Sequence, residues 1–273
     1  MGYSLYDWNQ ALQQRNEYVE DRLKDGSPII AVSYEDGILM LTIRGTQRKL
    51  FDVYDRLMMG ALGKQSDIES LRLAAVDVAH KEGFERSPDD VSIQRLVGFS
   101  LSPAVKRVYN DQQSIPLTFR AVFAEMSRSP ETDHFFILGY EGEFRTQERF
   151  AVAAGTPYAE EQAEDVLREA APATLDEALR AALQAWGTGR SRLSPTSGNG
   201  DDEEAREFDP LRDDRRGGDE GPTVSDDPAV AIREALKDKG VVEAAILSRN
   251  SARESKFRLL KERDLEAVLA DYR

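Results

Sequence analysis

The clearest pattern of apolar positions lies between residues 27 and 66, where four short apolar runs follow one another. The runs 29–32 and 38–41 flank Glu35-Asp36-Gly37, which is typical of a tight hairpin because glycine accepts the positive φ of such turns. The runs 50–54 and 57–63 are separated by Asp55-Arg56. Because all four runs are nearly continuous instead of alternating, they predict strands that are buried on both faces.

Helical periodicity begins directly after Gly63 and returns at several points along the chain. It predicts helices at 7–24, 67–83, 87–109, 158–169, 174–186, 228–237 and 262–272. Further strands are predicted at 117–126, 134–140, 150–155, 241–247 and 256–260. The helix from 87 has Ser87 as a cap and Pro88 in its first turn, and Pro103 is expected to bend or break it.

Residues 187–227 differ from the rest of the chain in composition. They hold 12 Asp and Glu against 6 Lys and Arg, with many Gly and Pro and few large apolar residues. Such a stretch buries too little apolar surface to offset the entropy of ordering it. We therefore expect one domain made of 1–186 and 228–273, interrupted by an acidic disordered insertion at 187–227.

The overall charge excludes several kinds of partner. A net charge of −14 disfavours binding to nucleic acid or to an anionic membrane surface, because both carry negative charge. The chain has no cysteine, no signal-like start and no apolar run of about 20 residues, so we expect a cytoplasmic protein.

Motifs for catalysis or for a cofactor are weak. Residues 58–66 resemble a phosphate loop, but Met58 replaces its first glycine and Gln65 its Ser or Thr. The histidines, His80 and His134, have no ligand-like neighbours, so no metal and no cofactor are expected. Paired carboxylates such as Asp89-Asp90 are interpreted as helix caps and solvated charge.

Three segments, in this order, resemble a known family. They are Tyr34-Glu35-Asp36-Gly37-Ile38-Leu39, then Lys49-Leu50-Phe51-Asp52-Val53-Tyr54-Asp55-Arg56, and Gly60-Ala61-Leu62-Gly63 leading into a helix. Their order and spacing resemble the opening of proteasome subunits, and the helix that precedes them resembles that of bacterial α-type subunits. The resemblance covers nearly the whole chain outside the acidic insertion.

The resemblance implies an α+β fold, a four-layer α-β-β-α sandwich of two mainly antiparallel sheets between helix layers. It also implies a non-catalytic subunit that forms a ring, expected to be seven-membered, on a β-type partner and receives a hexameric ATPase or another activator. Lys49, with Arg44 as the second candidate, would hold the C-terminal carboxylate of that activator. The remaining candidates are a gate at the chain start (Gly2, Tyr3, Ser4, Leu5, Tyr6) and a ring-interface helix (Trp8, Leu12, Arg15, Val19).

Two other functions remain open at this point. A peptidase of the same fold would expose Ser27 as a nucleophile by cleavage, because an N-terminal nucleophile uses its own α-amine as the base. Pro28 and the helix before Ser27 favour a simple strand start instead. The third possibility is a ligand-binding α/β module that is unrelated to proteolysis.

Overall fold

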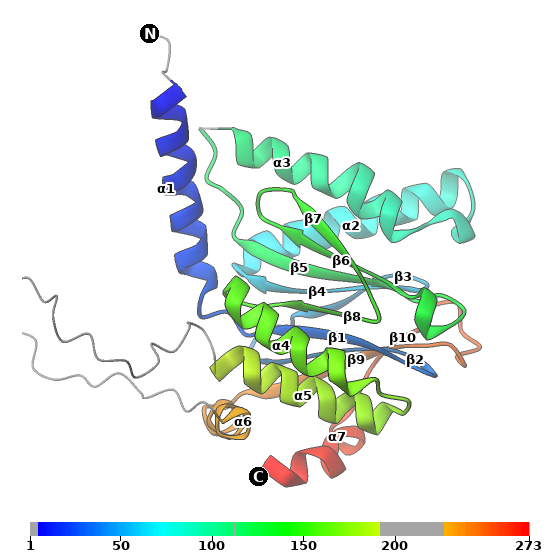
Figure 1. Ribbon diagram of the computed structural model, residues 1–273. Coiled ribbons are helices and arrows are strands. Elements are labelled where there is room, and N and C mark those ends of the chain that lie inside the picture. The colour runs from blue at the N-terminus through cyan, green and yellow to red at the C-terminus, as the bar shows by residue number, and fades with distance from the viewer. Residues whose placement is uncertain (1–4, 112, 192–226, 273) are drawn as a thin grey trace, which may run out of the picture.

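Three of the four apolar runs of the opening stretch form inner strands of two sheets that pack face to face, and the fourth, 50–54, forms an edge strand (Figure 1). The burial on both faces predicted for 50–54 is wrong, because three of the five positions of this edge strand are partly or fully exposed. The computed structural model describes residues 5–111, 113–191 and 227–272. One sheet has the order β10-β9-β2-β1-β8 and the other β3-β4-β5-β6-β7, and all pairings are antiparallel. The strands are β1 (Ile29–Tyr34), β2 (Gly37–Arg44), β3 (Leu50–Tyr54), β4 (Leu57–Gly63), β5 (Phe119–Glu125), β6 (His134–Gly139), β7 (Phe144–Glu148), β8 (Phe150–Ala153), β9 (Val241–Ser248) and β10 (Phe257–Leu259).

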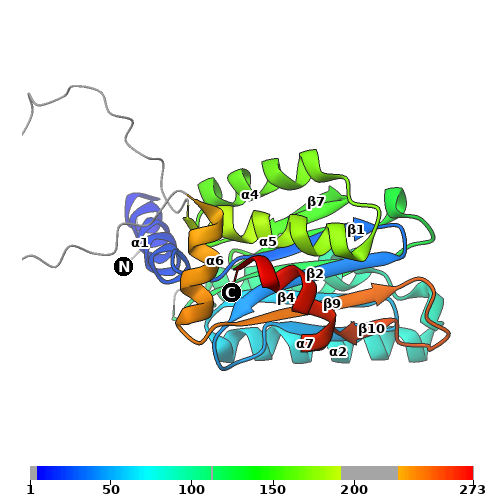
Figure 2. The same ribbon diagram turned by 90° about the horizontal axis from the view of Figure 1, so that it is seen from below.

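Helices cover the outer face of each sheet and complete four layers. Helices α4 and α5 pack on the β1-containing sheet, and α2 packs on the β4-containing sheet. Seen from below, α5, α6 and α7 lie over the β1-containing sheet (Figure 2). The helices are α1 (Leu5–Leu23), α2 (Gln65–Glu85), α3 (Ser102–Asn110), α4 (Pro157–Ala170), α5 (Leu175–Ser191), α6 (Pro228–Lys237) and α7 (Glu262–Leu269). The predicted four-layer α+β sandwich is confirmed.

Strand β1 shows why the apolar runs are continuous. Ile30 and Val32 belong to the core under α4 and α5, whereas Ile29 and Ala31 belong to the core between the sheets. Alternate side chains of one strand point to opposite faces, so a strand that is covered on both faces carries apolar side chains at successive positions. All six residues of β1 are buried.

The predicted hairpin at Asp36-Gly37 is present, but the role expected for Gly37 is wrong. Among the described glycines only Gly63 and Gly142 have a positive φ. A Cβ on Gly37 would lie 1.9 Å from the carbonyl oxygen of Leu247 on β9. The glycine is therefore required because β9 approaches the turn so closely, and the turn itself does not need it.

The helix expected from Ser87 is broken into three parts. The Ser87 side chain accepts from the Asp89 N–H, but it caps only a 3-10 turn, Pro88–Asp90. The chain then becomes extended at Val91 and continues as a π-helix, Gln94–Leu101, before α3. Pro103 lies in the first turn of α3, where a missing N–H costs little. The backbone stays helical at Leu101 and Ser102 as the π-helix passes into α3, so the predicted break at Pro103 does not occur.

Helix α5 extends five residues beyond its predicted end, because residues 187–191 are helical and largely buried. Gly187 and Gly189 indicated a break in the sequence, yet here they allow close packing. A Cβ on Gly187 would lie 2.5 Å from the carbonyl oxygen of Pro228 on α6. The acidic insertion therefore begins later than 187, and its remainder at 192–226 lies outside the described residues.

Candidate functional site

The loop 45–49 joins β2 to β3 and is fastened at both ends by one carboxylate. Glu243 on β9 lies opposite Thr42 in the sheet register. Its Oε2 accepts the Lys49 backbone N–H at 2.9 Å and lies 3.3 Å from Arg44 Nε, an ion-pair contact that lacks the alignment of a hydrogen bond. Arg44 Nη1 also donates to the carbonyls of Gly45 and Thr46. Arg44 is therefore engaged within its own loop.

Glu243 is a buried carboxylate, with 6% of the residue exposed. Burial raises its pKa, and the Lys49 N–H and the Arg44 charge oppose that shift. Drawing Arg44 toward a ligand would leave this carboxylate with less compensation in a poorly solvated place, which is costly. Of the two predicted carboxylate-binding residues, Arg44 is the less available.

Unlike Arg44, Lys49 has a charged group that no described residue engages. Its side chain is only partly exposed, and within the described part of the chain no hydrogen bond or ion pair reaches its ammonium group. Burial and, to a smaller extent, the nearby Arg190 charge together lower the pKa of Lys49 to about 8, although Glu243 opposes the shift. This partly desolvated ammonium lies near a second cation and has no hydrogen-bonded anion within the described residues, so an incoming carboxylate would be stabilised here.

A pocket of about 590 Å³ opens beside this loop, between the loop, α5 and α6. Arg44 and Arg190 line it together with Asp25 and Ser27. Arg190 Nη1 donates to the Asp25 carbonyl at 2.9 Å, just after α1 ends. The sequence did not identify Arg190 or Glu243, because they lie far along the chain from the loop and only the fold brings them to it.

The Ser27 hydroxyl is used as a structural anchor. It donates to the Ile43 carbonyl at 2.5 Å, accepts from the Trp186 indole N–H at 3.0 Å and lies 3.1 Å from the Thr42 hydroxyl. These contacts come from β2 and α5, so they fix the chain where β1 begins. None of the Ser27 contacts in the described structure is with a side chain able to serve as a general base.

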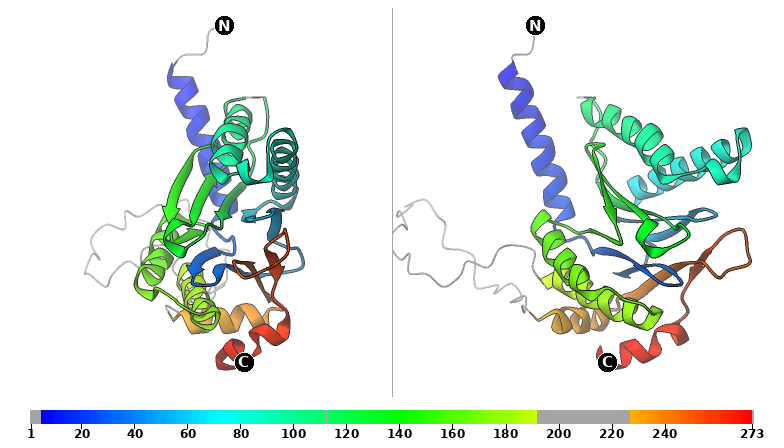
Figure 3. Two further views of the ribbon diagram at one scale, coloured as in Figure 1. Left: turned by 90° about the vertical axis from the view of Figure 1, so that its right-hand side faces the viewer. Right: turned by 45° about the vertical axis from the view of Figure 1, so that its right-hand side comes forward.

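Helix α1 stands beside the four layers, with its N-terminal end pointing away from them (Figure 3). Val19 is fully buried in the core between the sheets, so its assignment to a ring interface is wrong: its own subunit covers it. Arg15 donates to the Ser114 carbonyl at 3.0 Å and lies over the Tyr109 ring. Leu12 is partly exposed and stays a candidate for a contact with a neighbour, while the side chain of Trp8 lies outside the described residues.

Two of the five residues predicted to form a gate belong to a helix. Leu5 and Tyr6 form the start of α1, so they do not belong to an extension ahead of the helix. Gly2, Tyr3 and Ser4 lie outside the described residues.

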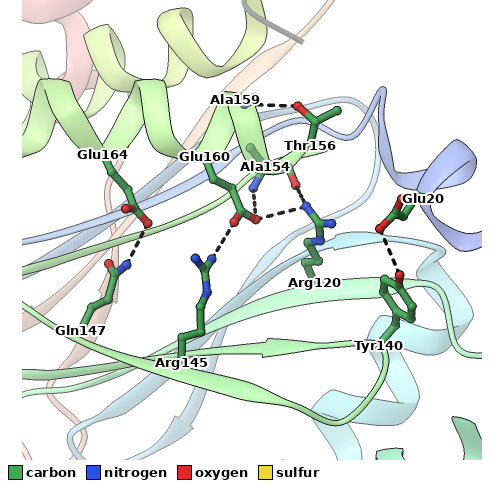
Figure 4. Close-up of polar contacts among 10 residues, drawn as sticks. All are labelled: Glu20, Arg120, Tyr140, Arg145, Gln147, Ala154, Thr156, Ala159, Glu160 and Glu164. Carbon is green, nitrogen blue, oxygen red and sulfur yellow. Dashed lines mark hydrogen bonds and ion pairs between the residues drawn. The ribbon is translucent and has the colours of Figure 1, made fainter. Parts of the chain in front are cut away.

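A second polar cluster joins the two sheets at their β7 and β8 edges (Figure 4). Glu160 on α4 is 5% exposed and accepts from Arg120 on β5 at 3.3 Å, from Arg145 on β7 at 2.6 Å and from the Ala154 N–H at 3.2 Å. Burial raises the pKa of Glu160, and the two guanidinium groups oppose that shift. Because α4 packs on one sheet and both arginines come from the other, Glu160 ties the layers of the sandwich together.

The described residues lack two other features that would point to a different function. Residues 5–111, 113–191 and 227–272 contain no group of three or more His, Asp or Glu side chains placed to hold a metal ion. Within the same ranges, no helix is both long and apolar enough to cross a membrane.

Comparison with known proteins finds several proteasome α subunits that are similar to this chain. No family model matches the chain. Proteasome subunit alpha of Actinosynnema mirum is 27% identical over 265 residues, which cover 96% of this chain and 85% of that protein. Proteasome subunit alpha of Kineococcus radiotolerans is 28% identical over 66% of this chain and 75% of its own length. The protein of the same name from Geodermatophilus obscurus is 30% identical over 70% of this chain and 66% of its own length.

Proposed function

Because this chain belongs to the proteasome α-subunit family, we propose that it forms the outer, gating ring of a self-compartmentalised protease and does not itself cleave peptide bonds. A β-type subunit would carry the proteolysis, and an ATPase ring or another activator would dock on the outer face of the α ring. The ring is expected to hold seven copies of this chain.

The continuity of α1 with β1 is the observation that carries the proposal. Val19 and Leu23 of α1 are fully buried, so the helix is part of the core that precedes β1. An N-terminal nucleophile needs a free α-amine at the start of its strand. Removing α1 to expose Ser27 would uncover this core and take away the residues that pack beside the sheets.

A surface beside α1 supports assembly into a ring. A groove of about 670 Å³ runs between α1 and the segment before β5, and Ala11, Tyr18 and Ile115 contribute to its walls. Tyr18 is 42% exposed and Ile115 is 74% exposed, although both side chains are large and apolar in most of their area. We propose that a neighbouring copy of the chain covers this groove, with Leu12 at the edge of the contact.

Lys49 supports activator docking through a C-terminal carboxylate. Its ammonium group is partly desolvated and makes no hydrogen bond or ion pair to an anion within the described residues, whereas Arg44 forms an ion pair with Glu243. A carboxylate that accepts a charge-assisted hydrogen bond from Lys49 would supply the anionic partner that its ammonium group lacks. We therefore assign the docking role to Lys49 and a loop-fastening role to Arg44.

The segment ahead of α1 is proposed to close the entrance of the ring. In this proposal only residues 1–4 act as the gate, because α1 already begins at Leu5. A change in the tilt of α1 would move this segment directly.

Co-expression with a β-type subunit, followed by electron microscopy, tests the proposal. We expect stacked rings that contain this chain at its full mass. A chain that stays monomeric by light scattering in the presence of the β subunit would refute the assembly. Loss of residues 1–26 in the intact-mass spectrum, together with peptide hydrolysis by this chain alone, would instead establish a peptidase.

A further inference from the structure

The first half of β9 has a neighbouring strand on one side only. Within the described residues, β2 pairs with β9 along its whole length, whereas the register of β10 with β9 covers residues 245–247 and goes no further. One more bond follows, from the Leu260 N–H to the Ala244 carbonyl at 2.8 Å, and the chain then leaves the sheet to form α7. Backbone groups two residues apart on a strand face the same edge, so the N–H and the carbonyl of Val242 point to the side that β10 leaves free.

A groove of about 460 Å³ opens at this free edge, between the start of β9, α6 and α7. We call it the β9 groove. Its apolar lining consists of Leu236, Val241, Val242, Leu259, Leu260, Leu265 and Leu269. Val241 is 48% exposed, and the leucines from α6 and from the end of β10 are partly exposed. An unpaired strand edge beside exposed apolar side chains can add an extended segment as a further strand.

The charges of the β9 groove favour an acidic occupant. Arg44 and Arg48 both line it, together with the carboxylates of Glu243 and Glu262. Arg44 and Glu243 already form an ion pair with each other at 3.3 Å. Arg48 is exposed, and it makes no hydrogen bond or ion pair to any described residue. The groove therefore offers an extended segment three things: a strand edge, an apolar surface and one cation without a partner among the described residues.

The chain contains an acidic segment that matches this description. Residues 201–211, DDEEAREFDPL, hold six acidic residues against one arginine, and Phe208 and Leu211 are its large apolar residues. The segment lies in the stretch that ends where α6 begins, and α6 itself lines the groove. The residues from 212 to 227 can span roughly 50 Å when extended, which is far more than the roughly 15 Å length of α6. Residues 201–211 can therefore reach the β9 groove of their own chain.

We propose that residues 201–211 dock in the β9 groove of the same chain, as an extended segment that bonds to the backbone of Val242 and places acidic side chains beside Arg48. The inference does not depend on the proposed function, because the groove and its occupant belong to one chain. Phe208 and Leu211 supply the apolar contact, and the main-chain bonds form whatever the side chains are. The docked segment occupies an edge that another protein could otherwise pair with, and charged side chains suit such an outermost strand.

Amide hydrogen exchange of the full-length chain tests the proposal, read from the peptic fragment that covers residues 240–246. In one variant, residues 201–211 are replaced by a Gly/Ser sequence of the same length. The matched control replaces 212–222 in the same way, because that stretch has equal length, no large apolar residue, and four acidic residues against three arginines. Two further variants are Arg48→Glu, and Arg48→Glu combined with Glu203→Lys, Glu204→Lys and Glu207→Lys.

The expected size of the effect follows from the tether. A tethered segment has an effective concentration of about 1 mM, so a segment that binds with a Kd of about 0.1 mM protects the Val242 amide about tenfold. Replacing 201–211 is expected to remove this protection, and replacing 212–222 is expected to keep it. Arg48→Glu is expected to reduce the protection by about threefold. The variant with exchanged charges is expected to recover it, which a purely local effect of Arg48 on the fold would not produce.

Three results would overturn the proposal. The first is equal exchange at 240–246 in the unaltered chain and in the 201–211 replacement. The second is an equal loss of protection in the 212–222 control, which would mean that the length of chain matters and the acidic segment does not. The third is protection that survives the replacement of 201–211 and falls on tenfold dilution of the protein, which would assign the β9 groove to a second copy of the chain.

Discussion

Carboxylate docking at Lys49 should weaken steeply above neutral pH, at a pH where most lysine sites are still fully charged. An unperturbed lysine has a pKa of 10.5, whereas burial and the neighbouring Arg190 hold that of Lys49 at about 8 in the ligand-free chain. Only the protonated form attracts a carboxylate strongly. Raising the pH therefore removes the binding-competent form before it affects ordinary lysines.

The size of the effect follows from this difference in pKa. With a pKa of about 8, roughly nine-tenths of the Lys49 side chains are protonated at pH 7 and roughly one-tenth at pH 9. A bound carboxylate restores the pKa of Lys49 toward its ordinary value, so the complex stays protonated across this range. The affinity for the peptide is therefore expected to fall about tenfold between about pH 7 and pH 9.

Fluorescence anisotropy of a labelled C-terminal peptide, titrated at half-unit steps of pH, measures this dependence. The matched control is Lys49→Arg, because arginine stays charged throughout the range. Every other titrating group is the same in both proteins, so the difference between the two pH profiles belongs to position 49. The arginine variant is expected to bind with nearly constant affinity.

A flat profile in the unaltered chain would show that Lys49 is not the group that holds the carboxylate, or that its charge is already compensated. An equally steep profile in Lys49→Arg would assign the pH dependence to another group. Either result would refute the reasoning from the unpaired ammonium.

Three further changes test other parts of the description. Lys49→Met should abolish peptide binding and raise the free energy of unfolding at pH 7 by about 1 kcal/mol in urea titrations. The reason is that the lowered pKa of Lys49 means that its charged form opposes folding below about pH 8. A loss of stability in this variant would contradict the prediction. Glu160→Ala should lower the free energy of unfolding by about 3 kcal/mol or more, since Arg120 would stay buried without its carboxylate partner. A loss below about 1 kcal/mol would show that water replaces the ion pairs of Glu160. Ser27→Ala should cost about 1 kcal/mol through the lost Trp186 bond and leave peptide hydrolysis by the assembled complex unchanged, whereas loss of hydrolysis would make Ser27 a nucleophile.

The sandwich was predictable because its central strands are apolar on both faces. β1, β2 and β4 are almost entirely buried, and their runs begin and end within a few residues of the predicted limits. The Asp36-Gly37 turn was also predicted, but the prediction assumed that Gly37 is needed for a positive φ in the turn. The actual constraint on Gly37 comes from β9, far away in the sequence, and no local pattern contains it.

The elements that were missed depend on tertiary contacts. Strand β7 is an edge strand with mostly exposed positions, so its residues show no apolar run. Its polar side chains are held from α4, where Glu164 accepts from Gln147 at 2.8 Å. The break after Ser87 likewise depends on Glu125 of β5, which accepts the Ile93 N–H at 2.8 Å and holds the chain extended ahead of the π-helix.

The candidate site was likewise predictable only in part. Lys49 was identified through a family resemblance, and the structure adds that its ammonium group is partly buried and makes no hydrogen bond or ion pair within the described residues. What distinguishes it from Arg44 is the position of Glu243, which comes from a strand near the other end of the chain. Arg190 was assigned to the acidic segment, because the helical pattern of α5 weakens at Gly187 and Gly189.

The close contact of α5 with α6 also makes this part of the fold tolerant of changes in chain length. Helix α5 ends at Ser191 and α6 begins at Pro228, and the two helices touch where Gly187 meets Pro228. Neither sheet has to change register when residues are gained or lost there, so a reporter domain could be spliced in beside the basic loop while the sandwich stays as it is.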